Sequence, residues 1–374
     1  MPAHSPRFIA GLAMLCLGFF DGVLGVAWLS IHGDLSVSLE SLGWVLGAVG
    51  IGSAVGSAIF PSLVRSTSHL NLLSISLGVQ ALVLFAVVLS QQYWVFVVLY
   101  AIRGIANGLA HAALNAFFAQ RISPQHLMNI HGGWGIGTAS AGFLSGLMIA
   151  ADWGWESVYL FGGALSLAAM GAVFKTRHNF HHLGVSLDSK QHDVFRMTLP
   201  IVFAVLSGAL YVGLEQGIGN WISSILVAVD GASIQQAGIA TGLFWGGLTL
   251  GRFTLTRIPV STLQMLRWAS ALIGVILLVL ILMPTELKIV AYAFLGFAMA
   301  PMSAFILTAG ARLVPAGKRD LMMAIQVLSF SAGAAVIPAA LGGVASVTSI
   351  AMVHIGFIGV AALLIVSIWI TVKE

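Results

Sequence analysis

Residues 8–31 read FIAGLAMLCLGFFDGVLGVAWLSI, a continuous apolar run in which Asp21 is the only charged side chain. A helix needs about 20 mainly apolar residues to cross about 30 Å of hydrocarbon. This run meets that length, and it is too long for the apolar core of a signal peptide. We therefore interpret it as a retained transmembrane helix.

Eleven further runs of the same kind follow along the chain. Connections between them are short, except for a polar segment at 175–195. The runs are too long and continuous for the alternating strands of about 10 residues that build a membrane barrel. The sequence therefore predicts an all-α membrane protein with twelve transmembrane helices. These lie at 8–31, 43–63, 71–90, 95–121, 128–150, 156–174, 196–226, 235–255, 264–283, 287–311, 319–347 and 350–372.

Composition supports the same fold class. Of 374 residues, 59% are hydrophobic and only 7% are charged, with a mean hydropathy of +1.01. A soluble domain carries about 25% charged residues, so a globular enzyme, a disordered chain and a secreted disulfide scaffold are excluded. Cys16 is the single cysteine, which excludes an intramolecular disulfide.

Basic residues predict the orientation in the membrane, because lysine and arginine accumulate in cytoplasmic segments. If both termini are cytoplasmic, 14 of the 16 basic residues lie on the inner side, Lys288 lies outside and Arg103 lies deep in a span. We expect a multi-pass protein of the cell inner (plasma) membrane. The net charge of +4 follows from this topology and does not indicate a nucleic-acid partner.

The two halves of the chain repeat one another. Glycines in the run at 43–63 recur in the run at 235–255, each 195 residues later: Gly43, Gly47, Gly52 and Gly56 match Gly238, Gly242, Gly247 and Gly251. Close helix packing alone also selects glycine, but several matches in one order favour duplication. We predict an N-terminal six-helix bundle at 1–174, a cytoplasmic linker at 175–195 and a C-terminal six-helix bundle at 196–374, related by pseudo-symmetry.

Two parallel six-helix repeats joined by a polar linker are typical of the major facilitator superfamily. The sequence resembles that superfamily along its whole length, and within it the fucose-permease-like branch. The resembling stretches are GIANGLAHAALN at 104–115, NIHGGWGIG at 129–137, YVGLE at 211–215 with Trp221, and FWGGLTLGR at 244–252. The resemblance implies alternating access about a site at mid-membrane, and proton-coupled symport of sugars. Where the fucose permease has a glutamate, this sequence has His111.

Ionisable residues inside the spans are the first candidates for a site. Such a residue costs at least about 2.5–3.5 kcal/mol on insertion scales, so it faces a partner or a water-filled cavity. Asp21 shares a helix face with Gly25 and Trp28. It could load and release a proton as the cavity opens to each side. The alternative is a fixed ion pair with Arg103.

A polar stripe marks the helix at 95–121. Arg103, Asn107, His111 and Asn115 recur every four residues, which makes a stripe about 18 Å long at 1.5 Å per residue. We expect it to face the cavity or another helix, with the arginine and the asparagines binding substrate. Histidine is the only side chain of the stripe whose unperturbed pKa lies near neutral pH, so we assign His111 to proton coupling, with simple packing as the alternative.

The helix at 196–226 carries the second acidic candidate. Glu215 is expected to stand across the cavity from Asp21 and to take part in proton coupling, unless it only bonds to neighbouring backbone. Gln216 and Asn220 form the adjacent face and are predicted substrate contacts.

Aromatic and further polar residues complete the set of candidates. Trp134 and Trp245 could stack on a sugar ring or only mark the membrane interface, and Gln326 is a possible substrate contact. Asn129 and His131 could form an inner gate. Trp44, Trp94, Trp153 and Trp155 fit an outer aromatic belt. The linker histidines His178, His181, His182 and His192 match no structural zinc pattern, and we interpret them as solvated.

These features predict a secondary active transporter that moves a small polar solute, a sugar or sugar derivative, by proton-coupled alternating access. The alternative is a proton-coupled exporter of drugs or organic cations. Outside transport, a membrane sensor without flux remains open. The chain carries no HExxH or GxxxxGK[ST] motif, so we expect neither an enzyme nor an ATP-driven pump. The expected partners are a small-molecule substrate, protons and the lipid bilayer, with no metal or cofactor and a monomeric protein.

Overall fold

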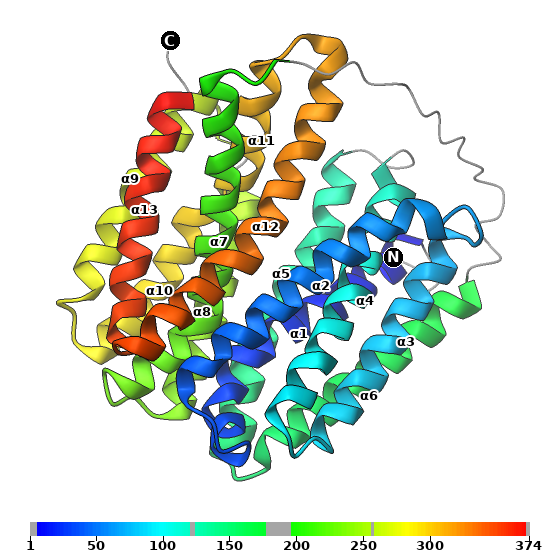
Figure 1. Ribbon diagram of the computed structural model, residues 1–374, viewed down its shortest axis with the longest axis vertical. Coiled ribbons are helices and arrows are strands. Elements are labelled where there is room, and N and C mark those ends of the chain that lie inside the picture. Colours follow the sequence, from blue (N-terminus) through cyan, green and yellow to red (C-terminus); the bar gives the residue numbers. More distant parts are fainter. Residues whose placement is uncertain (1–5, 120–123, 177–195, 256–257, 372–374) are drawn as a thin grey trace.

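The computed structural model describes residues 6–119, 124–176, 196–255 and 258–371, and every regular element in these ranges is a helix (Figure 1). The first half contains α1 (Pro6–Asp34), α2 (Leu42–Leu63), α3 (His69–Val88), α4 (Tyr93–Ala119), α5 (Pro124–Ala150) and α6 (Gly154–Thr176), with a short helix η1 (Leu39–Ser41). The second half contains α7 (Leu199–Ala228), α8 (Ile234–Thr254), α9 (Thr262–Leu280), α10 (Thr285–Met299), α11 (Met302–Arg312), α12 (Arg319–Val347) and α13 (Ala351–Thr371), with η4 (Ala316–Lys318). The predicted all-α fold class is confirmed.

One predicted helix differs from the structure. The run at 287–311 was expected to form a single span, but it forms α10 and α11, which meet at Ala300 and Pro301. A proline inside a helix removes one backbone donor, and its ring clashes with the preceding turn. Together the two helices form one apolar segment, Thr285–Arg312, which is long enough to cross a membrane.

Among the described residues, ten segments are long and apolar enough to cross a membrane. The helices α5 and α8 complete the twelve. They are richer in glycine and polar residues because they pack against each other, where small residues let backbones approach closely. A side chain at Gly142 would overlap with the backbone of Gly242, and one at Gly146 would overlap with that of Gly238.

Helices of the first half pack mainly on one another, and so do those of the second half (Figure 1). The repeat is visible in equivalent contacts. Gly56 of α2 packs on the Ile105 carbonyl of α4, and the matching Gly251 of α8 packs on the Phe297 carbonyl of α10. The bundle boundaries at 174 and 196 stay a prediction. The linker histidines lie outside the described residues.

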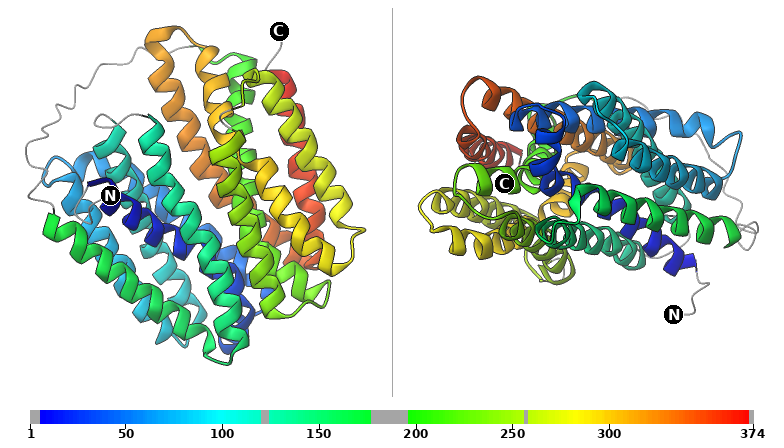
Figure 2. Two further views of the ribbon diagram at one scale, coloured as in Figure 1. Left: turned by 180° about the vertical axis from the view of Figure 1, so that it is seen from behind. Right: turned by 90° about the horizontal axis from the view of Figure 1, so that it is seen from below.

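The two halves meet mainly along three helix pairs, α2 with α12 (Figure 1), α5 with α8 (Figure 2) and α1 with α7. On α2, Gly43 touches Gly342 and Gly50 touches Ala335 of α12. Further along the same helix, Ser53 and Ser57 line a cavity instead. The halves are therefore closed at the end where α2 begins. They separate toward the opposite end, where α2 ends and α7 begins.

Three of the four tryptophans expected in an outer belt are exposed: Trp44, Trp94 and Trp153 are 66%, 64% and 65% exposed. The prediction is wrong for Trp155, which is buried at 5% exposure. Its indole donates a hydrogen bond of 2.7 Å to the Asp34 carboxylate. Trp155 therefore links the start of α6 to the end of α1 through this hydrogen bond.

The α5–α8 contact can be tested with two glycines of α8. Gly238→Ala places a Cβ against the backbone of Gly146, whereas the nearest atom to a Cβ at Gly246 is the Ala139 Cβ at 4.0 Å. Overpacking costs about 1–3 kcal/mol, so G238A should lower the thermal unfolding temperature in detergent. The control G246A should leave it unchanged or slightly higher, because alanine favours helix. Equal effects of the two substitutions would contradict this packing.

Candidate functional site

A cavity of about 580 Å³ lies between the two halves. This volume is within the range of about 300–1,000 Å³ typical of small-molecule sites. Six helices form its wall: α1, α2, α4 and α5 from the first half, and α7 and α12 from the second. The polar wall residues are Asp21, Ser53, Ser57, Arg103, Asn107, His111, Asn115, Trp134, Gln216, Asn220 and Ser331. The wall thus combines residues of both repeats.

All four members of the polar stripe on α4 lie on this wall, namely Arg103, Asn107, His111 and Asn115. Their spacing of four residues keeps them on one helix face. Asn107 is buried, and its Oδ1 has no hydrogen-bond partner among the described residues. That oxygen is a free acceptor beside the cavity.

The charged centre of the site is an ion pair between α1 and α4. The Arg103 guanidinium donates to the Asp21 carboxylate at 2.6 Å, and its side chain is only 2% exposed. The rings of Phe20 and Tyr100 flank it, with centroids 5.8 and 5.7 Å from its Cζ. Tyr100 is itself hydrogen-bonded to Tyr159. Arg103 is therefore held in one position from several sides.

Asp21 has a second partner on α5. The Trp134 indole donates to its other carboxylate oxygen at 2.9 Å. Both oxygens are thus occupied, and the carboxylate joins α1, α4 and α5. The ion pair with Arg103, which is the alternative role for Asp21, is present. The carboxylate also lies on the cavity wall, as a proton-coupling role requires.

One polar side chain from outside α4 bonds to the stripe, and two more line the wall from the second half. His131 of α5 lies 2.9 Å from Asn115, nitrogen to amide oxygen, and so links α4 to α5 beside the cavity. From the second half, Gln216 and Asn220 of α7 reach the wall, and the Asn220 amide donates to the Gln216 carbonyl at 2.9 Å. The side chain of Asn129 lies outside the described residues.

Glu215 does not face Asp21 across the cavity, and that expectation is wrong for this conformation. Its carboxylate accepts hydrogen bonds from Arg252 of α8 at 3.2 and 3.3 Å and from the Tyr211 hydroxyl. Successive helical residues point about 100° apart. Gln216 therefore faces the cavity while Glu215 faces α8.

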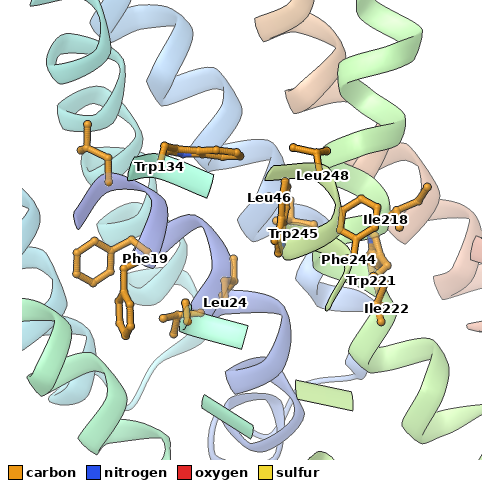
Figure 3. Packing of buried hydrophobic residues seen from close by; sticks show 14 of the residues in the cluster. Phe19, Leu24, Leu46, Trp134, Ile218, Trp221, Ile222, Phe244, Trp245 and Leu248 are labelled. Carbon is orange, nitrogen blue, oxygen red and sulfur yellow. The ribbon is translucent and has the colours of Figure 1, made fainter. Parts of the chain in front are cut away.

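Trp245 and Gln326 also lie behind the wall, not on it. Trp245 is fully buried and packs edge-to-face against Trp134, with ring centroids 5.3 Å apart (Figure 3). Gln326 is fully buried and donates to the Ile306 carbonyl at 2.9 Å. A solute in the cavity does not reach either side chain in this conformation.

Arg252 was not predictable as a site residue, and its sequence position indicates only a basic residue of the inner side. The repeat gave no signal for it, since the offset of 195 residues maps Arg252 onto Ser57, a residue without a predicted role. Ser57 lines the cavity, whereas Arg252 pairs with Glu215. Within the described ranges, no group of three or more His, Cys, Asp or Glu residues could hold a metal.

The Asp21–Arg103 pair can be tested by its contribution to stability. Asp21→Ala leaves a buried guanidinium without its carboxylate, which costs about 3–5 kcal/mol. The double variant D21A/R103M removes both charges, so we expect it to be more stable than D21A alone. Thermal unfolding in detergent measures the losses of D21A, of R103M and of the double variant. A double variant that loses the sum of the two single losses would contradict the pairing.

Comparisons with known proteins agree with this architecture. The model of the Major Facilitator Superfamily matches residues 10–288. The Multidrug resistance protein MdtG of Klebsiella pneumoniae (strain 342) is 29% identical over 184 residues, which cover 46% of this chain and 42% of that protein. The chain therefore aligns with less than half the length of this relative.

Solved structures share the fold at low identity. A bacterial homologue of the human lysosomal transporter Spinster, in an inward-facing and occupied conformation, has a TM-score of 0.75 at 13% identity and covers 99% of this chain and 97% of its own. The nucleoside transporter NupG has a TM-score of 0.72 at 15% identity, covering 98% of this chain and 99% of its own. At such identities the likeness establishes the fold alone. The family match along most of the chain shows that this protein belongs to the Major Facilitator Superfamily and is a multi-pass membrane transporter rather than an enzyme.

Proposed function

We propose that the protein is a secondary active transporter for a small, neutral, polar solute, a sugar or sugar derivative. The observation that carries this proposal is the charge of the cavity wall. Its carboxylate, Asp21, is already neutralised by Arg103 at 2.6 Å, and the other acidic candidate, Glu215, is turned away toward Arg252. A neutral solute fits such a wall better than a cation.

The remaining polar wall groups suit hydroxyl groups. Asn107, Asn115, Gln216 and Asn220 are amides, which both donate and accept hydrogen bonds. They come from α4 and α7, on opposite halves of the molecule. A solute that bridges these two helices would contact both repeats, as a site at a repeat interface requires in alternating access. We assign Arg103 and these four amides to binding, with Trp134 as an aromatic wall.

Proton coupling is assigned to Asp21, with His111 as its neighbour on the wall. A proton on the carboxylate would remove the charge that holds Arg103 and release its donors to a solute. With both termini cytoplasmic in the cell inner membrane, the open end of the cavity faces the cytoplasm. We place the symport cycle in this orientation.

An amphipathic export substrate is the second candidate. It is favoured by the match to a protein named for multidrug resistance and by apolar wall residues such as Phe20, Leu24 and Phe330. A neutral amphipathic compound would use the same amides. An organic cation would require a free carboxylate, and the cavity wall offers none in this conformation.

Binding to purified protein in nanodiscs separates these candidates. We expect methyl glycosides to quench indole fluorescence saturably, because Trp134 lines the cavity, and tetraphenylphosphonium to have no effect. N107A should weaken glycoside binding about tenfold, the effect of losing roughly 1.4 kcal/mol. The control N71A removes an asparagine of α3 outside the cavity wall and should bind normally. Saturable binding of the cation without binding of any glycoside would reject the proposal.

Transport in proteoliposomes tests the coupling. An inward proton gradient should accelerate uptake of a glycoside that binds, and D21N should keep binding but lose the acceleration, because the amide does not take up the proton. Wild-type uptake that is independent of the gradient would contradict proton coupling while leaving solute binding intact.

A further inference from the structure

Trp134 contacts both halves of the transporter. Its indole Nε1 donates to Asp21 of α1 at 2.9 Å. Its ring packs edge-to-face on Trp245 of α8, with centroids 5.3 Å apart and an interplanar angle of 89°. In Figure 3 the indole extends from α5 toward the side of the molecule that holds Trp245. The residue therefore lies between the cavity and the interface of the halves.

The same ring lies beside the second ion pair, in which Glu215 is buried and Arg252 is partly exposed. The Arg252 guanidinium carbon is 5.7 Å from the Trp134 ring centroid, and Arg252 binds Glu215 of α7 at 3.2 Å. A guanidinium over a tryptophan face is attracted by the negative face of the ring quadrupole. Trp134 thus joins a pair in the first half, Asp21–Arg103, to a pair in the second half, Glu215–Arg252.

The position of Trp134 is fixed from α1. A side chain at Gly18 would overlap with the Trp134 carbonyl oxygen, so the two backbones touch at this point. Trp134 is only 8% exposed. With its backbone against α1, the indole is oriented by its hydrogen bond to Asp21 on one side and by its contacts with Trp245 and Arg252 on the other.

We propose that Trp134 is a positioning residue that couples the ion pair of the cavity to Arg252 of the other half, and so holds the conformation described here. The inference rests on the proposed solute binding at Asp21 and Arg103. A solute that takes Asp21 or Arg103 as a partner weakens the indole hydrogen bond. The indole ring can then rotate away from the Arg252 guanidinium, and this weakens the packing of α5 against α8.

A purely structural Trp134 would act by packing alone, and two matched substitutions distinguish the roles. Trp134→Phe keeps a ring for Trp245 and Arg252 but removes the N–H donor. Trp245→Phe makes the same change in a neighbouring ring whose Nε1 has no hydrogen-bond partner among the described residues. The two variants therefore differ in one hydrogen bond, which joins Trp134 to Asp21.

The test measures how often the closed end opens. Leu46 lines the cavity on α2, between the contacts that Gly43 and Gly50 make with α12. In a Cys16→Ser background, Leu46→Cys would be reached by a membrane-impermeant maleimide from the face opposite the termini only when the halves separate there. Its alkylation rate in sealed, oriented vesicles reports the population of that state. No solute is added.

We expect W134F to accelerate this alkylation about tenfold, since a hydrogen bond to a charged group is worth at least that factor. W245F should alkylate at the rate of the parent protein. Equal rates for W134F and W245F would overturn the proposal.

Arg252→Lys supplies a second, independent variant. Lysine keeps a positive charge for Glu215 but lacks the planar guanidinium that stacks on a ring. R252K should also accelerate alkylation. The double variant W134F/R252K should be no faster than W134F, because both substitutions interrupt the same chain of contacts from Asp21 through Trp134 to Arg252. Independent, multiplying effects would overturn the coupling. Since the assay contains no solute, its failure would leave the binding proposal to the fluorescence experiment.

Discussion

Burying the Asp21 and Arg103 charges inside the membrane is the constraint on which the site depends. Unpaired, each charge would be expensive in hydrocarbon. The protein satisfies them with the ion pair at 2.6 Å, two flanking aromatic rings and the Trp134 indole. These contacts come from α1, α4 and α5, so the same interactions that stabilise the charges also fix three helices of the first half around the cavity.

The second half pairs its membrane-embedded acidic residue in a different way. Its acidic residue, Glu215, pairs with Arg252 of the adjacent helix α8, with the pair turned away from the cavity wall. The repeat therefore preserves helix packing, as in the matched glycines Gly56 and Gly251, while its charges have diverged. One pair faces the cavity and the other faces the interface. This asymmetry leaves amides and hydroxyls to select the solute, which is the physical basis for proposing a neutral one.

Much of the fold was predictable from sequence because a membrane imposes a strong and simple pattern. The apolar runs gave the helices, except at Pro301, where one run became α10 and α11. The stripe from Arg103 to Asn115 was also predictable, since polar residues every four positions share one helix face, and all four line the cavity.

Periodicity did not give the direction in which each face points. Glu215 and Gln216 are neighbours in sequence, and only the tertiary packing of α7 against α8 decides that the glutamine, not the glutamate, reaches the cavity. Gln326 and Trp245 were misplaced for the same reason, since a polar or aromatic residue behind a wall has the same sequence signal as one on it. Finding Arg252 required its partner, which lies 37 residues earlier in the chain.

The claim that both repeats share one solute chamber is tested most directly by chemical protection within it. Ser331 of α12 lines the cavity from the second half, and Ser346 of the same helix is exposed outside it. In a Cys16→Ser background, a saturating methyl glycoside should slow alkylation of S331C by a soluble maleimide and leave S346C unchanged. A glycoside that binds to the protein yet leaves S331C fully reactive would contradict the account.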